Sequence, residues 1–162
     1  MRFTKIKKTK EGKIFLEYQE QNPNGQYDNY SFECTEAALP EFTQALSALA
    51  PDMLELCELP EDRLSRITVK AVSLAYSGDK EVMGACISGC MELLLSNCPL
   101  NLNTPFKPSG SYTDAPPADD QVLSGKTVSR IEKLCDEARR YLRGERAQGN
   151  LFKAWEEKKE EF

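Results

Sequence analysis

The stretch ITVKAVSLAYSGDKEVMGACISGCMELLL (67–95) decides the fold class. Its first ten residues are rich in branched side chains, 77–80 have turn chemistry, and 82–95 form a second apolar run. This pattern predicts a β-hairpin at the centre of a sheet, with Gly84 and Gly89 at bulges or close contacts. The second run is compatible with cover on both faces, because Met83, Ala85, Ile87, Met91, Leu93 and Leu95 alternate with Val82, Cys86, Cys90 and Leu94.

The N-terminal third predicts a second hairpin. Residues 13–20 and 27–34 alternate apolar and polar side chains, and Asn22-Pro23-Asn24-Gly25 supplies the turn between them. Upstream, lysines alternate with apolar residues over 3–7, which is typical of an edge strand. An alternative interpretation is that the basic start, with six Lys and Arg side chains against Glu11 over 1–13, contacts a phosphate backbone.

Helical spacing appears in two places. Between Leu39 and Cys57 it is interrupted by Pro51, which predicts two short helices or one broken helix. Residues 122–144 predict an amphipathic helix, with Ser124 as its cap and Gly144 as its stop. We therefore expect an α+β domain over 1–106, in which the interrupted helix packs on an antiparallel sheet of two hairpins. After it we expect a proline-rich linker over 107–121, the amphipathic helix over 122–144 and a polar tail over 145–162.

Composition removes several classes of chemistry. The chain has 162 residues, a net charge of −5 and no histidine, so it holds no Ser-His or Cys-His nucleophile pair and no histidine-ligated zinc. Its six cysteines lack the C-x2-C spacing of zinc and redox sites. We name no catalytic residue, metal or cofactor. With no signal peptide or membrane span in the sequence, we expect a cytoplasmic binding protein with reduced cysteines and no membrane contact.

The predicted C-terminal helix carries one apolar stripe. The stripe is a candidate face for a protein partner, and packing of the helix on its own sheet is the alternative. Its residues are Val128, Ile131, Leu134, Ala138, Tyr141 and Leu142.

The polar tail contains a short motif, Gln148-Gly149-Asn150-Leu151-Phe152. It resembles the Gln-x-x-Leu-Phe peptide of bacterial proteins that dock into the sliding clamp, where the Leu and Phe side chains fill an apolar pocket. The resemblance implies that Gln148, Leu151 and Phe152 are partner-binding residues. The alternative is that Leu151 and Phe152 pack on the body of the protein or begin a last short helix through Trp155.

A longer resemblance spans nearly the whole chain. The segments that carry it are Cys57-Glu58-Leu59-Pro60, residues 67–73, Val82-Met83-Gly84-Ala85, residues 99–105 and residues 146–152. They resemble a group of small early-region proteins of temperate phages and prophages of Gram-positive bacteria. The resemblance implies a role beside phage replication and recombination, and some accessory proteins of this kind are recombination directionality factors that switch a serine integrase to excision.

Together these observations predict a non-enzymatic adaptor of phage DNA metabolism in the bacterial cytoplasm, with little or no direct DNA contact. Its expected partners are a DNA-processing enzyme, best a serine integrase, and the sliding clamp. Two alternatives remain. One is an acidic inhibitor of a host defence enzyme. The other is a single-stranded DNA-binding protein whose platform is the aromatic hairpin with Phe15, Tyr18, Tyr27, Tyr30 and Phe32.

Overall fold

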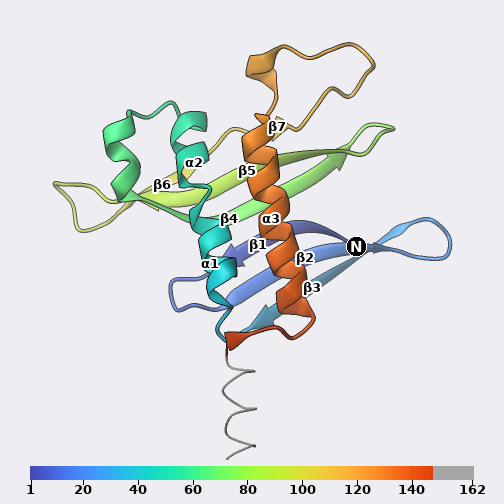
Figure 1. Ribbon diagram of the computed structural model, residues 1–162, viewed down its shortest axis with the longest axis horizontal. Helices are drawn as coiled ribbons and strands as arrows, with labels where there is room; N and C mark the ends of the chain where they lie inside the picture. Colours follow the sequence, from blue (N-terminus) through green and yellow to red (C-terminus); the bar gives the residue numbers. More distant parts are fainter. Residues whose placement is uncertain (148–162) are drawn as a thin grey trace, which may run out of the picture.

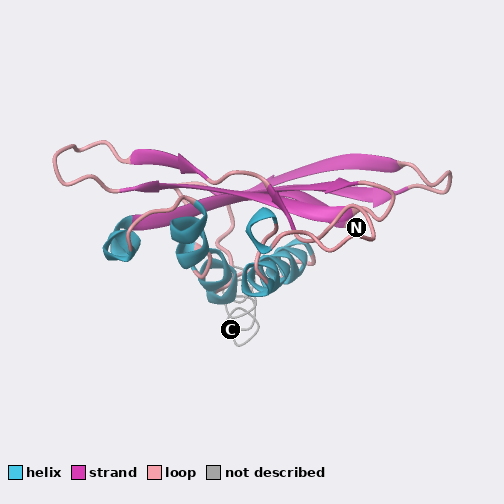
Figure 2. Cartoon of the chain, turned by 90° about the horizontal axis from the view of Figure 1, so that it is seen from above, coloured by secondary structure: helices cyan, strands magenta, loops and turns pink. Residues whose placement is uncertain are grey.

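An antiparallel sheet with helices on one face forms the body of the protein (Figures 1 and 2). The computed structural model describes residues 1–147. Within them the strand order is β3-β2-β1-β4-β5-β6, and β7 pairs with β5. This confirms the α+β class, the antiparallel sheet and the C-terminal helix. The strands are β1 (Arg2–Lys8), β2 (Ile14–Gln21), β3 (Tyr27–Cys34), β4 (Ile67–Ser77), β5 (Val82–Met91), β6 (Leu100–Asn103) and β7 (Lys107–Pro108).

The β4–β5 hairpin lies inside the sheet, as its apolar pattern predicts. Val72 pairs with Ile87 and Leu74 with Ala85, and all four side chains are buried on the face that the helices cover. The expected strand over 82–95 ends earlier, at Met91, because the backbone N–H of Glu92 bonds to the carbonyl of Arg66 and the chain then turns. The expectation that the strand and its alternation continue through Leu93 and Leu95 is therefore wrong.

The first strand is not an edge strand, contrary to the expectation from its lysines. β1 pairs with β2 on one side and with β4 on the other. Phe3 and Ile6 face the core and are fully buried, while Lys5 and Lys7 are only partly buried and point to the other face. The lysine alternation marks the sheet face without helices, and the strand order is set by pairing between distant residues.

The helices follow the predicted breaks. α1 (Pro40–Ser47) and α2 (Ala50–Leu56) are the two short helices, with Pro51 in the first turn of α2. α3 (Gly125–Leu142) begins at its predicted cap, where the Ser124 hydroxyl accepts a hydrogen bond from the N–H of Thr127 at 3.2 Å. Gly144 follows the helix with a φ of 95°, which glycine adopts without strain. Two 3-10 helices, η1 (Glu61–Arg66) and η2 (Asp119–Gln121), lie in the connections.

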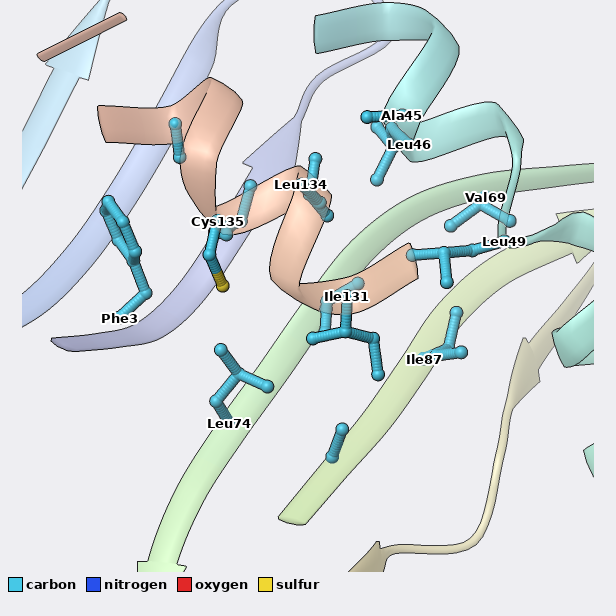
Figure 3. Packing of buried hydrophobic residues seen from close by; sticks show 14 of the residues in the cluster. Phe3, Ala45, Leu46, Leu49, Val69, Leu74, Ile87, Ile131, Leu134 and Cys135 are labelled. Atoms are coloured by element: carbon cyan, nitrogen blue, oxygen red, sulfur yellow. The ribbon is translucent and has the colours of Figure 1, made fainter. Parts of the chain in front are cut away.

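One hydrophobic core joins α3 to the sheet and to α1 (Figure 3). Ile131, Leu134 and Ala138 of α3 are fully buried in it. The segment before α3 is also attached to the sheet. Lys107 and Pro108 of the expected linker pair with β5 as strand β7, and the Leu123 N–H bonds to the Pro108 carbonyl at 2.9 Å. The helix over 122–144 thus packs on the same sheet as the rest of the chain.

A buried carboxylate ties α2 to α3. The Asp52 side chain is 3% exposed, and it accepts a hydrogen bond from the Thr127 hydroxyl at 2.6 Å. The Arg130 guanidinium donates to both of its carboxylate oxygens, at 3.0 and 2.9 Å. Arg130 is 38% exposed, so solvent reaches the cation of the pair and not the anion.

This asymmetry predicts unequal costs for removing each partner. Arg130→Met leaves a buried carboxylate with one hydroxyl partner, and we expect the unfolding free energy to fall by about 2–4 kcal/mol. Asp52→Asn leaves an arginine that water can solvate, and we expect a smaller loss of about 1–2 kcal/mol. Urea unfolding of both single variants and the double variant measures the difference. A larger loss in Asp52→Asn than in Arg130→Met would contradict this interpretation.

Two glycines of β5 are close contacts of different kinds. A Cβ on Gly89 would lie 2.1 Å from the backbone carbonyl oxygen of Thr68 in the paired strand. A Cβ on Gly84 would lie 2.2 Å from the ring of Phe106, a side chain that is 47% exposed. The first neighbour is held by the sheet, whereas the second is able to rotate away.

We expect Gly89→Ala to destabilise the protein by about 3 kcal/mol or more, because the strand backbones must separate. Gly84→Ala should cost only about 1 kcal/mol, the price of moving one half-exposed ring. Thermal melts of Gly89→Ala, of Gly84→Ala, and of Phe106→Ala with and without Gly84→Ala test these two expectations. In the double variant the added methyl group should cost almost nothing; a Gly84→Ala penalty that persists without the Phe106 ring would disprove the ring contact.

Candidate functional site

Three consecutive leucines protrude from the loop between β5 and β6. We call Leu93, Leu94 and Leu95 the leucine loop; their exposed fractions are 37%, 83% and 101%. Leu100, where β6 begins, is 45% exposed. Burying a leucine contributes about 1.5–3 kcal/mol, so Leu94 and Leu95 together forgo about 3–6 kcal/mol in the free protein. A concentrated apolar surface of this kind is typical of a protein contact site.

A cleft opens beside the leucine loop, where the sheet splits. β1 and β4 pair only where Lys5–Lys7 faces Ala71–Ser73. Beyond that point the β1–β2 turn leaves β4, which has a bulge between Val69 and Ala71. The resulting cleft has a volume of about 650 Å³ and reaches the base of the loop at Leu93. Figure 1 shows the β1–β2 turn and the β5–β6 loop at the same end of the molecule.

The cleft carries more positive than negative charge. Lys8, Lys10 and Lys70 line it, and Glu92 is its single acidic lining residue. The Lys8 ammonium donates to the Thr43 hydroxyl at 3.2 Å. Among the side chains that the structure describes, no carboxylate forms an ion pair with any of the three lysines. We call this feature the lysine cleft.

The candidate partner face of α3 is mostly inside the protein. Ile131, Leu134, Ala138 and Tyr141 are between 0% and 1% exposed, because they pack on the chain's own sheet and α1. This placement corrects the expectation that they meet a partner. The other two residues of the stripe, Val128 and Leu142, are partly buried against the same core.

The tail motif falls outside the described part of the chain. Gln148, Leu151 and Phe152 all follow residue 147, so sliding-clamp docking stays a prediction. The last described residues are fixed on the body. The Ala147 N–H bonds to the Ala37 carbonyl at 3.0 Å, and the Arg146 guanidinium bonds to the Glu36 carboxylate at 2.7 Å.

The aromatic residues of the first hairpin contact other side chains of the same fold, although Tyr30 is 44% exposed. Tyr18 stacks on Tyr30 with ring centroids 5.5 Å apart, and Phe32 meets the ring of Tyr141 edge-on. The Arg2 guanidinium lies 3.7 Å from the ring centroid of Tyr27. Phe15 alternates with buried Ile14 and Leu16, so it lies on the other face of β2. The five rings are divided between both sheet faces and do not form one base-stacking platform.

The six cysteines are free thiols with unequal access to solvent. Cys98 is exposed in the β5–β6 loop, while Cys90 and Cys135 are buried. Burial raises the pKa of Cys135 to about 11 and also raises the pKa of Cys57, with a smaller contribution from Cys86. Thiolates are the reactive form, so the loop and core thiols should differ in alkylation rate.

No protein family, curated protein or solved structure matches the chain. Within residues 1–147, no helix is long and apolar enough to cross a membrane. The side chains that the structure describes include no group of three or more Cys, Asp or Glu placed to hold a metal ion.

Sequence reasoning missed both parts of the candidate site. The leucine loop was assigned to a strand because Leu93 and Leu95 continue the alternation of β5. A signal was present, since three adjacent leucines break the period of two and turn-forming residues follow directly at 96–99. The basic start over 1–13 is a local signal for Lys8 and Lys10, but their meeting with Lys70 has none, because it depends on the pairing of β1 with β4.

Cys98 provides a direct check on the exposure of the β5–β6 loop. At pH 8 we expect iodoacetamide to modify Cys98 first, whereas Cys135, with roughly one thiol in a thousand ionised, reacts only after unfolding. Mass spectrometry of peptides after timed alkylation measures both rates. All six cysteines should react together in urea, which serves as the control. Protection of Cys98 in the native protein would show that the loop is covered.

Proposed function

We propose that the chain is a non-enzymatic adaptor that binds another protein through the leucine loop. The observation that carries this proposal is the exposure of Leu94 and Leu95, which have no contact in their own fold that offsets their hydration. Binding sites in which a few apolar side chains contribute most of the affinity are common at protein interfaces.

The resemblance to temperate-phage early proteins suggests which partner to test. We propose a DNA-processing enzyme in the bacterial cytoplasm, with a serine integrase as the first candidate. The adaptor would act as an excision factor by binding one conformation of the integrase more tightly than the other. A tenfold shift between two conformations requires a difference in binding free energy of about 1.4 kcal/mol, which is less than one buried leucine supplies.

A second contact is proposed for the tail. Gln148, Leu151 and Phe152 would dock into the sliding clamp as the resemblance of their motif implies. The tail leaves the body next to Ala37, at the start of α1, whereas the leucine loop follows β5. Separate attachment points allow two partners to be held at once, and a tethered second contact raises the effective concentration of the complex.

The double variant Leu94→Ser/Leu95→Ser tests the loop contact. We expect it to lose at least tenfold in affinity for the integrase, because two apolar side chains no longer become buried. Its melting temperature should stay within about 2 °C of the wild type, since both side chains are already exposed in the free protein. Surface plasmon resonance with immobilised integrase and a thermal melt provide the two measurements.

The matched control is Leu64→Ser, which changes a leucine that is 38% exposed in η1 and lies outside the loop. This control should bind as the wild type does. Integrase binding that is equal in the loop variant, the control and the wild type would contradict the proposed function of the loop. Leu151→Ala/Phe152→Ala should leave integrase binding intact and abolish clamp binding.

A further inference from the structure

We infer that the lysine cleft binds an extended peptide segment of the partner protein in which acidic and aliphatic side chains alternate. The inference rests on the proposed function and extends it, because it names the chemistry of the segment that the adaptor recognises. Three properties of the cleft support it: its charge, its floor and its strand edges.

The charge of the cleft selects an anionic occupant. Lys8 and Lys10 come from β1 and the turn after it, and Lys70 comes from β4, so lysines from both sides of the split line the cleft. The chain as a whole has a net charge of −5, yet these three lysines have no ion-pair partner among the described residues. An acidic segment would supply the missing counter-charges on both sides, and such complementarity favours recognition and fast association.

The floor of the cleft selects aliphatic side chains. Leu46 of α1, Val69 of β4 and Leu93 of the leucine loop contribute to its lining, together with Pro99. A volume of about 650 Å³ accommodates a few side chains of an extended peptide. Successive side chains of an extended chain point to opposite sides, so alternating residues meet the aliphatic floor and the lysines in turn.

The split in the sheet leaves strand edges inside the cleft. β4 continues through Thr68 and Lys70, past the last residue of β1 that pairs with it, and in this stretch no described strand pairs with the edge that faces β1. Unpaired strand edges accept an added strand through main-chain hydrogen bonds, a common mode of peptide recognition. The edge provides affinity, and the lysines and the aliphatic floor provide specificity.

These properties favour a peptide over single-stranded nucleic acid. The described lining combines lysines with aliphatic side chains, whereas proteins that bind single strands combine basic residues with aromatic rings that stack on the bases. Oligonucleotide binding is therefore the competing outcome that the experiment must detect.

The test uses the full chain and a fluorescein-labelled eight-residue peptide in which Glu or Asp alternates with Leu or Val. We expect saturable binding by fluorescence anisotropy, and backbone amide shifts in the protein's NMR spectrum that concentrate on residues of the cleft. Lys10→Glu/Lys70→Glu should weaken binding by roughly tenfold or more, because attraction becomes repulsion at two positions. Ser47→Trp, which fills the cleft without changing charge, should weaken binding by a similar factor.

Matched controls separate the cleft from overall charge. Lys133→Glu reverses one charge, against two in the cleft variant, at an exposed position of α3 outside the cleft, and it should alter the affinity less than twofold. A peptide with Lys in place of each acid should not bind. Thermal melts exclude unfolding as the reason for any loss in a variant.

Three results would overturn the inference. They are an absence of peptide binding, equal weakening by Lys133→Glu and Lys10→Glu/Lys70→Glu, and tighter binding of an oligothymidylate than of the peptide. A failure of the proposed function gives a different set of results from a failure of the cleft inference. If Leu94→Ser/Leu95→Ser loses the integrase while Ser47→Trp and the cleft lysine variant retain it, the loop contact stands and the cleft inference falls. If the loop variant retains integrase binding and the peptide binds in the cleft, the cleft inference stands and the proposed loop contact falls.

Discussion

Docking of α3 onto one face of the sheet is the interaction on which the rest of the structure depends. Its buried side chains fill the space over the central strands, and both of its ends are tied to the body. At the start, the Asp52 carboxylate binds Thr127 and Arg130. At the end, the Tyr141 hydroxyl donates to the carbonyl of Glu36 at 2.6 Å. Because the helices pack on this one face, as Figure 2 shows, partly buried lysines are tolerated on the other.

The lysine cleft follows from the way this sheet is assembled. The pairing of β1 with β4 is short, and the bulge at Lys70 bends β4 where β1 has already turned away. The split brings Lys8, Lys10 and Lys70 around one cleft with a single acidic neighbour, Glu92. Three lysines that line one cleft attract an anion that enters it. The cleft thus favours an acidic occupant even though the chain is acidic overall.

Local sequence patterns predicted the helices and strands, whereas contacts between distant residues determine where each of them lies in the fold. The hairpins, the break at Pro51 and the cap at Ser124 depend on neighbouring residues, so periodicity and turn chemistry were sufficient for them. The interior position of β1 depends on pairing with residues some 65 positions away, and alternation reports only which face a lysine occupies. An apolar stripe on a helix likewise does not reveal whether the helix packs on its own chain or on a partner, and Ile131 packs on the sheet of its own chain.

The leucine loop and the lysine cleft are parts of one surface. Leu93 lines the cleft while Leu94 and Leu95 protrude beyond it, so a partner that covers the loop lies directly over the opening of the cleft. In the proposed complex the two parts would contribute differently to binding. Apolar burial at the loop supplies affinity that salt affects little, whereas the lysines supply long-range attraction that is screened beyond about 8–10 Å at physiological salt. A net charge of −5 adds repulsion between two free copies of the chain. The basic cleft beside the apolar loop therefore matches the acidic and aliphatic segment that we propose as its occupant.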